Sequence, residues 1–325
     1  MPLLSHNLPL LRTSGNRVIN AVTGTPVLLR GVNRSGLEYS EPDEQGFLSG
    51  ASISRAEIQF IIQAWGCNII RLPFNQDFVF RGRNSRTAEE YQQALDQVIY
   101  WASMFGAYTL LDLQWLDAER IYGGNRNFVA PLPNTQSIEL WSTLARRYKD
   151  EPAVLYDLFN EPHDRLPDDP YPLNKPDGTT WPASQMKVTM NEWQPWARKL
   201  TESIRVENPD ALIFIGGTNW AYDLRGMPID DLDNVVYSTH VYPNKGTDWN
   251  NVFGTLSESV PVFAGELGGT DSPDELDYVR RLLDYLDQRK IGFTAWSWFN
   301  EPYLVTRYTP TRFGAVVQQT LDGPR

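Results

Sequence analysis

The sequence is poor in the residues that build disulfides and metal centres. Its 325 residues include one cysteine, Cys67, and three histidines. A single cysteine excludes an internal disulfide and any multi-cysteine metal site, and so few histidines argue against a histidine-rich one. Cys67 lies between an apolar helical pattern and an apolar strand, a setting typical of a small buried hydrophobic residue rather than a reactive thiol. We therefore expect no metal and no cofactor.

The sequence also lacks long apolar runs and an excess of positive charge. No stretch reaches the roughly 18 apolar residues of a membrane span. The formal net charge is -11 and the sequence pI about 4.8. This acidity would repel nucleic acid and anionic membranes, but not an uncharged substrate such as a neutral glycan. We expect a monomer that binds neither nucleic acid nor a membrane.

The N-terminal residues do not resemble a secretory signal. Residues 1–5 have no basic segment and no following apolar segment of about 7–15 residues. Two interpretations remain, a cytoplasmic protein or a mature chain whose leader has been removed. We expect the second, a secreted extracellular protein.

Strand-like and helix-like segments alternate along the chain. The strands are continuous apolar runs, as expected when both faces of a sheet are buried. Strands are expected near 27–33, 68–73, 108–113, 153–159, 211–216, 234–239, 260–264 and 291–296. Helices are expected near 54–66, 87–106, 137–148, 191–206, 250–257 and 272–289, with one more after Pro310. Eight such βα units predict an α/β fold, a closed TIM (β/α)8 barrel rather than an open sheet.

Two further segments complete this organisation. Residues of about 8–20, with a turn at Gly15-Asn16, predict a hairpin that closes the bottom of the barrel. The segment from His163 to Pro182 is rich in Asp, Pro and Gly and falls between the fourth strand and its helix. We interpret it as a long active-site loop, so residues 1–325 form one catalytic domain.

The chemistry is expected where the strands end, because a barrel of this kind carries its catalytic groups at the C-terminal ends of its strands. Two carboxylates with hydrogen-bonding and aromatic support can cleave a glycosidic bond: one protonates the leaving oxygen and the other attacks the anomeric carbon. No lysine for a Schiff base and no glycine-rich phosphate loop occurs among these strand ends. The residues there are Asn33, Arg71, Gln114, Asn160, Glu161, His240, Tyr242, Glu266 and Trp296.

Five short motifs stand in order on these strands. They are Arg71-Leu72-Pro73, Leu158-Phe159-Asn160-Glu161-Pro162, His240-Val241-Tyr242, Gly265-Glu266 and Ala295-Trp296-Ser297. A lone Asn-Glu-Pro is a weak signal, but five motifs in this order are specific. Over nearly its whole length the chain resembles glycoside hydrolase family 5, a cellulase-like group of barrels with catalytic glutamates after strands four and seven.

The resemblance implies a retaining β-glycosidase with Glu161 as general acid/base and Glu266 as nucleophile. It also implies supporting roles for Arg71 (keeping Glu266 ionised), Tyr242 (a hydrogen bond to Glu266), His240 (beside Glu161), Asn160 (the sugar 2-hydroxyl) and Trp296 (the floor under the −1 sugar). Each supporting residue has a plainer interpretation, as a core side chain or a structural ion pair.

The third strand departs from the family. Where a histidine is usual after this strand, the chain has Leu113-Gln114-Trp115. Gln114 can hydrogen-bond a sugar hydroxyl but cannot carry charge. We expect catalysis to survive this change, because the position is supportive.

Several aromatic residues fall on the expected mouth loops and are candidates for stacking on sugar rings or for anchoring loops. Trp115 and Trp220 are the leading candidates, and His163 is left open between substrate contact and loop support. The remaining candidates are Tyr122, Trp181 and Trp249.

Two hypotheses of function follow. The first is an endo-acting retaining hydrolase of β-1,4-glucan, whose partner is a polysaccharide or oligosaccharide substrate; mannan, xyloglucan and mixed-linkage glucan remain alternatives. The second is a non-catalytic glycan-binding barrel, supported only by Gln114 and opposed by the presence of both glutamates.

Overall fold

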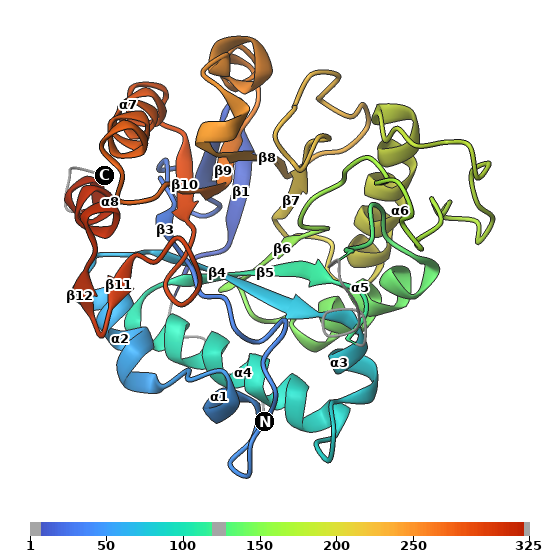
Figure 1. Cartoon of the computed structure of the whole chain (residues 1–325), viewed down its shortest axis with the longest axis horizontal. Coiled ribbons are helices and arrows are strands. Elements are labelled where there is room, and N and C mark those ends of the chain that lie inside the picture. The colour runs from blue at the N-terminus through green and yellow to red at the C-terminus, as the bar shows by residue number, and fades with distance from the viewer. Residues whose placement is uncertain (1–7, 119–127, 322–325) are drawn as a thin grey trace.

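The computed structural model describes residues 8–118 and 128–321. Eight parallel strands close into a barrel, so the predicted TIM fold is confirmed (Figure 1). In chain order the barrel strands are β3 (Arg30–Asn33), β4 (Ile69–Asn75), β5 (Tyr108–Trp115), β6 (Val154–Asp157), β7 (Ile213–Gly216), β8 (Val235–Val241), β9 (Val262–Leu267) and β10 (Gly292–Ala295).

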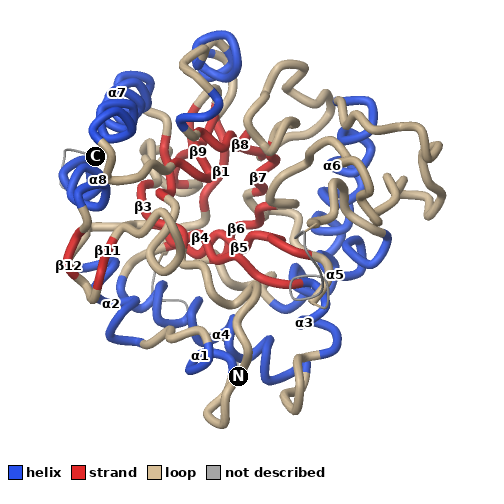
Figure 2. The backbone as a smooth tube through the Cα atoms, in the orientation of Figure 1, coloured by secondary structure: helices blue, strands red, loops and turns tan. Residues whose placement is uncertain are grey.

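Helices surround the barrel, as the blue and red segments of Figure 2 show. The covering helices are α2 (Arg55–Gln63), α4 (Ala88–Phe105), α5 (Thr135–Arg147), α6 (Met190–Glu207), α7 (Pro273–Arg289) and α8 (Arg312–Leu321). Between β7 and β8 the described chain has no helix. Between β8 and β9 it has only short 3₁₀ helices at Pro243–Lys245 and Leu256–Glu258 and a short π-helix at Asn250–Gly254. Eight strands are therefore not matched by eight regular helices.

Four short elements were not expected from the sequence. These are α1 (Phe47–Gly50), α3 (Gln76–Arg81) and the two strands of a small hairpin, β11 (Val305–Thr306) and β12 (Thr309–Pro310). Each is too short to produce a recognisable hydrophobic period. The hairpin matters for the site, because it follows β10 at the catalytic end of the barrel.

The N-terminal hairpin plugs the opposite end of the barrel. It consists of β1 (Leu11–Ser14) and β2 (Arg17–Asn20), close to the predicted range. Leu11 is buried in one cluster with Leu29, Ile69 and Phe263, which come from the starts of three barrel strands. Burial of these side chains from water holds the plug in place.

The middle of the barrel interior is polar. The strand predicted to end near Arg71 continues to Asn75, so Arg71 lies inside the barrel and not at its rim. Alternation along β5 directs Tyr108 and Leu110 into the bottom cluster and Asp112 into the next layer. Asp112 on β5 and Asp157 on β6 are register partners, and both are fully buried. This layer supports the site above it.

Candidate active site

Arg71 is the centre of a buried network beneath the barrel mouth. Its Nη1 donates to Asn33 Oδ1 and to Glu266 Oε1, and its Nη2 donates to Asn160 Oδ1, each over 2.9 Å. Its Nε donates to Asp157 Oδ2 over 2.9 Å. The guanidinium is fully buried. Its fixed planar geometry therefore orients side chains that come from β3, from β6 and the residues just after it, and from β9.

Glu266, on β9, is held at both of its carboxylate oxygens. Oε1 accepts from Arg71, and Oε2 accepts from the Tyr242 hydroxyl over 2.6 Å. The residue is 4% exposed. Burial raises the pKa of Glu266, while the positive charge of Arg71 and the hydrogen bond from Tyr242 oppose that rise. The expected effect of Arg71 is therefore present, although burial outweighs it.

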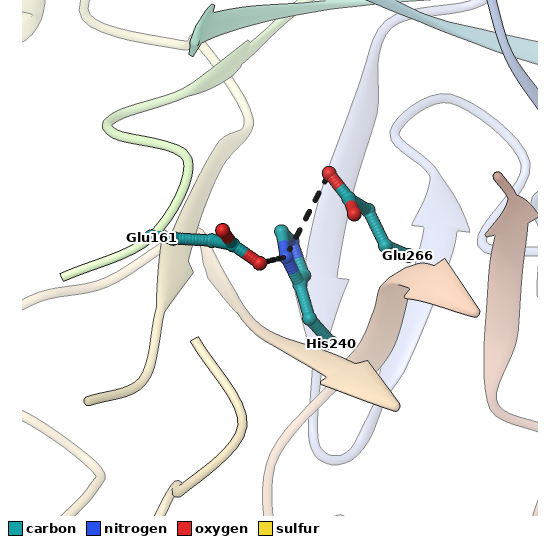
Figure 3. Close-up of side chains that lie close together, drawn as sticks. All are labelled: Glu161, His240 and Glu266. Atoms are coloured by element: carbon teal, nitrogen blue, oxygen red, sulfur yellow. Dashed lines mark hydrogen bonds and ion pairs between the residues drawn. The ribbon is translucent and has the colours of Figure 1, made fainter. Parts of the chain in front are cut away.

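Glu161 follows β6 and faces Glu266 across His240, as Figure 3 shows. Its Oε1 lies 2.9 Å from His240 Nδ1, and the same nitrogen lies 3.7 Å from Glu266 Oε1. One oxygen of Glu161, one oxygen of Glu266 and a nitrogen of His240 all lie within 4.8 Å of one another. The two carboxyl groups are thus close enough to act on a single bond.

Burial gives Glu161 and His240 shifted pKa values. It raises the pKa of Glu161 to about 7, although His163, Arg71 and Lys245 lower it. It lowers the pKa of His240 to about 4, so this ring is neutral near neutral pH. The Glu161 side chain is 21% exposed, so substrate and water can reach it. A carboxyl group with this pKa can carry a proton to a substrate at neutral pH.

The loop after β7 supports Glu161 from behind. The Trp220 ring stacks on His163 with ring centroids 3.7 Å apart and planes 9° from parallel. His163 Nδ1 lies 2.6 Å from the Glu161 carbonyl oxygen, and Trp220 N donates to Pro162 O over 3.0 Å. His163 is 1% exposed, which favours loop support over substrate contact.

The remaining predicted residues lie at the mouth. Gln114, near the end of β5, is half-buried, and its amide oxygen has no hydrogen-bond partner among the described residues. Trp115 is half-buried, with its ring centroid 5.8 Å from that of Tyr39. Trp296 follows β10 and is half-buried, with Nε1 donating to Glu301 O.

Two of the aromatic candidates are not placed for stacking on a sugar in the cleft. Trp249 is 6% exposed and packs against Tyr278, so the interpretation as an open platform is wrong. Trp181 packs against the Lys175 ammonium in a hollow beside α6 that neither Glu161 nor Glu266 lines. The third candidate, Tyr122, lies outside the described residues.

Sequence reasoning missed Asp112, Asp157 and Lys245. The two aspartates stand inside apolar strands, a signal that could have marked them as functional, because isolated buried carboxylates are rare. Lys245 follows β8, and its Nζ donates to the carbonyl and side-chain oxygens of Asn219 over 3.0 and 3.2 Å. Nothing in its local sequence distinguishes it from a surface lysine.

Two hollows open among the loops at the mouth. One, of about 480 Å³, is lined by Glu161, Trp220, Tyr242 and Lys245. The other, of about 540 Å³, lies between the loop after β3 and the β11–β12 hairpin and includes Tyr39 and Tyr303. The first hollow is formed mainly by residues that follow β8 and β9, and the second by residues that follow β3 and β10. The segment after β10 contributes to both, with Pro302 in the first hollow and Tyr303 in the second. A further hollow, of about 710 Å³, lies beside the N-terminal hairpin, and none of the predicted site residues lines it.

Glu161, His240 and Glu266 are also the described residues best grouped to hold a metal ion. Their other contacts suit proton chemistry better. Both Glu266 oxygens are already bound by donors, and the Arg71 cation lies 2.9 Å from one of them. A second positive charge at that oxygen would be repelled.

Comparison with known proteins agrees with the motifs. Endoglucanase A of Butyrivibrio fibrisolvens is 25% identical over 89% of this chain. Endoglucanase MaCel5A of a Microbulbifer species is 24% identical over 90% of it. The aligned regions span 59% and 51% of those two proteins, so this chain matches little more than half of their length.

Solved structures share the fold. A β-glucanase of Saccharophagus degradans superposes with a TM-score of 0.74 at 23% identity, covering 96% of this chain and 92% of its own. An endocellulase of Pyrococcus horikoshii gives a TM-score of 0.72 at 22% identity, covering 96% and 98%.

A family model also matches the part of the chain that contains the five motifs. The model described as cellulase (glycosyl hydrolase family 5) matches residues 22–302, which include every predicted site residue. The chain therefore belongs to glycosyl hydrolase family 5, within the class of glycoside hydrolases that its five motifs predict.

Proposed function

We propose that this protein is an endo-acting, retaining β-glycanase whose leading substrate is β-1,4-glucan. One observation carries the proposal: oxygens of Glu161 and Glu266 lie within 4.8 Å of each other, with different hydrogen-bond partners. Retaining glycosidases need their two carboxyl groups about 5–5.5 Å apart, whereas inverting ones leave about 6.5–9.5 Å for a water molecule.

In the first chemical step Glu161 gives its proton to the glycosidic oxygen while a Glu266 oxygen attacks the anomeric carbon. The carbon–oxygen bond breaks, the protonated leaving sugar departs, and a glycosyl ester of Glu266 forms. In the second step Glu161 takes a proton from water as the water oxygen attacks the same carbon, and Glu266 leaves as carboxylate. Two inversions at one carbon give net retention.

The neighbours of the pair support these roles. Arg71 and Tyr242 each hold one oxygen of Glu266, which favours its ionised form. Because Asn160 Oδ1 accepts from Arg71, its amide NH₂ is available to donate to a sugar hydroxyl.

The two hollows support endo action. A leaving sugar would occupy the side of Glu161 and Trp220, and the other end of the chain would lie toward Tyr39 and Tyr303. A polymer that occupied both hollows would have sugars bound on both sides of the cleaved bond. The S. degradans β-glucanase of similar fold has been crystallised with cellotetraose. The relatives named endoglucanase are consistent with this substrate class.

The first experiment is a reducing-sugar assay on neutral polysaccharides, with NMR of the newly formed anomer. We expect cleavage of β-1,4-glucan, a β-configured first product and a loss of viscosity that runs ahead of reducing-end release. Cleavage only of mannan or xyloglucan would change the substrate, and an α-configured first product would overturn the retaining mechanism. No turnover on any substrate would favour a glycan-binding barrel.

Two variants separate the roles of the glutamates. Glu266→Ala should lose turnover, and azide or formate should partly restore it with a product of the opposite anomeric configuration. Glu161→Ala should keep activity on dinitrophenyl glycosides, whose leaving groups need no protonation. If Glu161→Ala loses these substrates as completely as natural glycans, Glu161 is not the acid.

A further inference from the structure

Three carboxylates surround the single guanidinium of Arg71 inside the barrel. Oxygens of Asp112, Asp157 and Glu266 each lie 2.9 Å from one of its nitrogens. The side chains of Arg71 and Asp112 are 0% exposed, and that of Asp157 is 1% exposed. If all three carboxylates were ionised, the cluster would hold one positive and three negative charges away from water.

The three carboxylates are not equally bound. Asp157 accepts the Nε hydrogen of Arg71, and Glu266 accepts from Nη1 and from the Tyr242 hydroxyl. Asp112 Oδ1 lies near Nη2, but Nη2 donates to Asn160 Oδ1, and neither Asp112 oxygen receives a hydrogen bond from the described residues. An ionised carboxylate without donors is the costliest group to keep in such a place.

No other cation compensates this charge within the described cluster. His240, on β8, is neutral near neutral pH, since burial lowers its pKa to about 4. Glu38, on the loop after β3, adds no positive charge, and burial raises its own pKa to about 8. Burial raises the pKa of Asp112 well above its usual range, and the charges of Asp157 and Glu266 raise it further, against the opposing effect of Arg71.

We propose that Asp112 is a positioning residue that stays protonated at working pH, so that Arg71 directs its charge to Asp157 and Glu266. This inference goes beyond the proposed function and rests on it only for the role of Glu266. A neutral Asp112 keeps the packing beside Arg71 without competing for its charge. An ionised Asp112 would instead weaken the hold of Arg71 on Glu266 and disfavour the ionised nucleophile.

Two matched variants test this inference through the pH dependence of kcat/KM. Asp112→Asn replaces a protonated acid by a neutral group of the same shape, so kcat/KM should stay within about threefold and the acid limb should not move. Asp157→Asn removes a buried negative charge, so the acid limb should move to lower pH. If Asp112→Asn moves the acid limb as far as Asp157→Asn does, Asp112 is ionised and the inference fails.

Neutron diffraction from deuterium-exchanged crystals of the unaltered protein gives a second test that depends on neither variant folding. We expect a deuteron on an Asp112 oxygen and none on Asp157 at neutral pH. A bare Asp112 carboxylate would overturn the inference whatever the activity. If instead the protein cleaves no glycan but the deuteron is present, the proposed function fails and the protonation of Asp112 stands.

Discussion

Glu161 and Glu266 carry the same carboxyl group but contact different partners. Glu266 is held between a guanidinium and a phenol, whereas Glu161 contacts a neutral histidine and is partly open to the cleft. Two carboxyls whose surroundings differ in this way can divide the acid and nucleophile roles. Under the proposed mechanism, the division of roles is therefore a property of the neighbours and not of the residues themselves.

The raised pKa of Glu161 gives a testable pH dependence. A general acid must be protonated, so kcat/KM should fall as pH rises through a pKa of about 7, which gives the alkaline limb of the profile. A pH–rate profile on a neutral β-glucan measures this alkaline limb. A dinitrophenyl glycoside, which needs no protonation, should lose the limb if glycosyl transfer to Glu266 limits its rate. An alkaline limb that persists unchanged there would belong to another group.

Gln114 is expected to bind sugar without taking part in proton transfer. Gln114 is half-buried, and its amide oxygen is buried without a protein partner among the described residues, so a sugar hydroxyl that reached it would supply the missing hydrogen bond. Gln114→Ala should lower kcat/KM by the equivalent of about 1–3 kcal/mol while both limbs of the pH profile stay in place. Gln114→His, which restores the usual family residue, serves as the comparison. A shift of the alkaline limb by a full unit in Gln114→Ala would mean that the residue tunes Glu161.

Among the elements, the loop after β7 has an unusual backbone. Asn219, Trp220 and Ala221 have φ values of 55°, 63° and 55°, three successive residues in the left-handed region. Such a run is unfavourable for non-glycine residues and persists only where surrounding contacts enforce it. Here the Lys245 ammonium binds Asn219, the Trp220 ring stacks on His163, and Ala221 O accepts from His240 N. The loop therefore connects His163, His240 and Lys245, the three residues that surround Glu161.

Trp220→Ala should disturb the acid more than the nucleophile. Loss of the ring removes the stack on His163 that holds the Glu161 backbone. We expect kcat/KM on natural β-glucan to fall about tenfold or more, since small displacements of a catalytic group are costly. The reaction with a dinitrophenyl glycoside of the same glycone should fall much less. Equal losses on both substrates would mean that Trp220 acts through sugar binding instead.

The N-terminal hairpin is expected to stabilise the barrel without affecting its chemistry. Leu11 is 1% exposed beneath the strands, so Leu11→Ala should reduce the free energy of unfolding by about 2–3 kcal/mol. Val22, which is 85% exposed, offers a control, and Val22→Ala should change stability by less than about 0.5 kcal/mol. Urea unfolding measures both. A Leu11→Ala protein as stable as the control would show that the plug adds little.

The net charge of -11 belongs to the whole molecule, and it should repel negatively charged substrates. A carboxymethylated glucan should be repelled at low ionic strength, so its KM should fall as salt is raised from about 10 to 200 mM, where the screening length shortens. The KM for an unmodified β-glucan should change little over the same range. A parallel salt dependence for both polymers would point to an effect on the enzyme rather than on the encounter.

None of the described helices is long and apolar enough to cross a membrane. The barrel mouth carries two hollows, one that includes Glu161 and Trp220 and one that includes Tyr39 and Tyr303. Tyr303 at one of these hollows is 44% exposed, and Trp220 lines the other. An exposed tyrosine ring suits the apolar face of a sugar.

The sequence by itself determined the strand order and the position of two glutamates at the ends of barrel strands. Parallel strands buried on both faces appear as continuous apolar runs, and the ends of such strands must meet at one mouth. Glu161 and Glu266 lie 105 residues apart, yet short local motifs were enough to predict that they meet at the mouth. The hairpin at the bottom of the barrel was likewise predicted from local sequence, namely its turn residues.

Only the tertiary structure decided which side chains meet beneath that mouth. Asp112 and Asp157 stand in apolar strands, and their common contact with Arg71 depends on register and strand stagger, which single strands do not encode. Likewise, Trp220 and Trp249 both follow barrel strands in irregular segments, yet one lines the cleft and the other is buried. Such outcomes depend on contacts between residues distant in sequence, which exist only once the barrel closes.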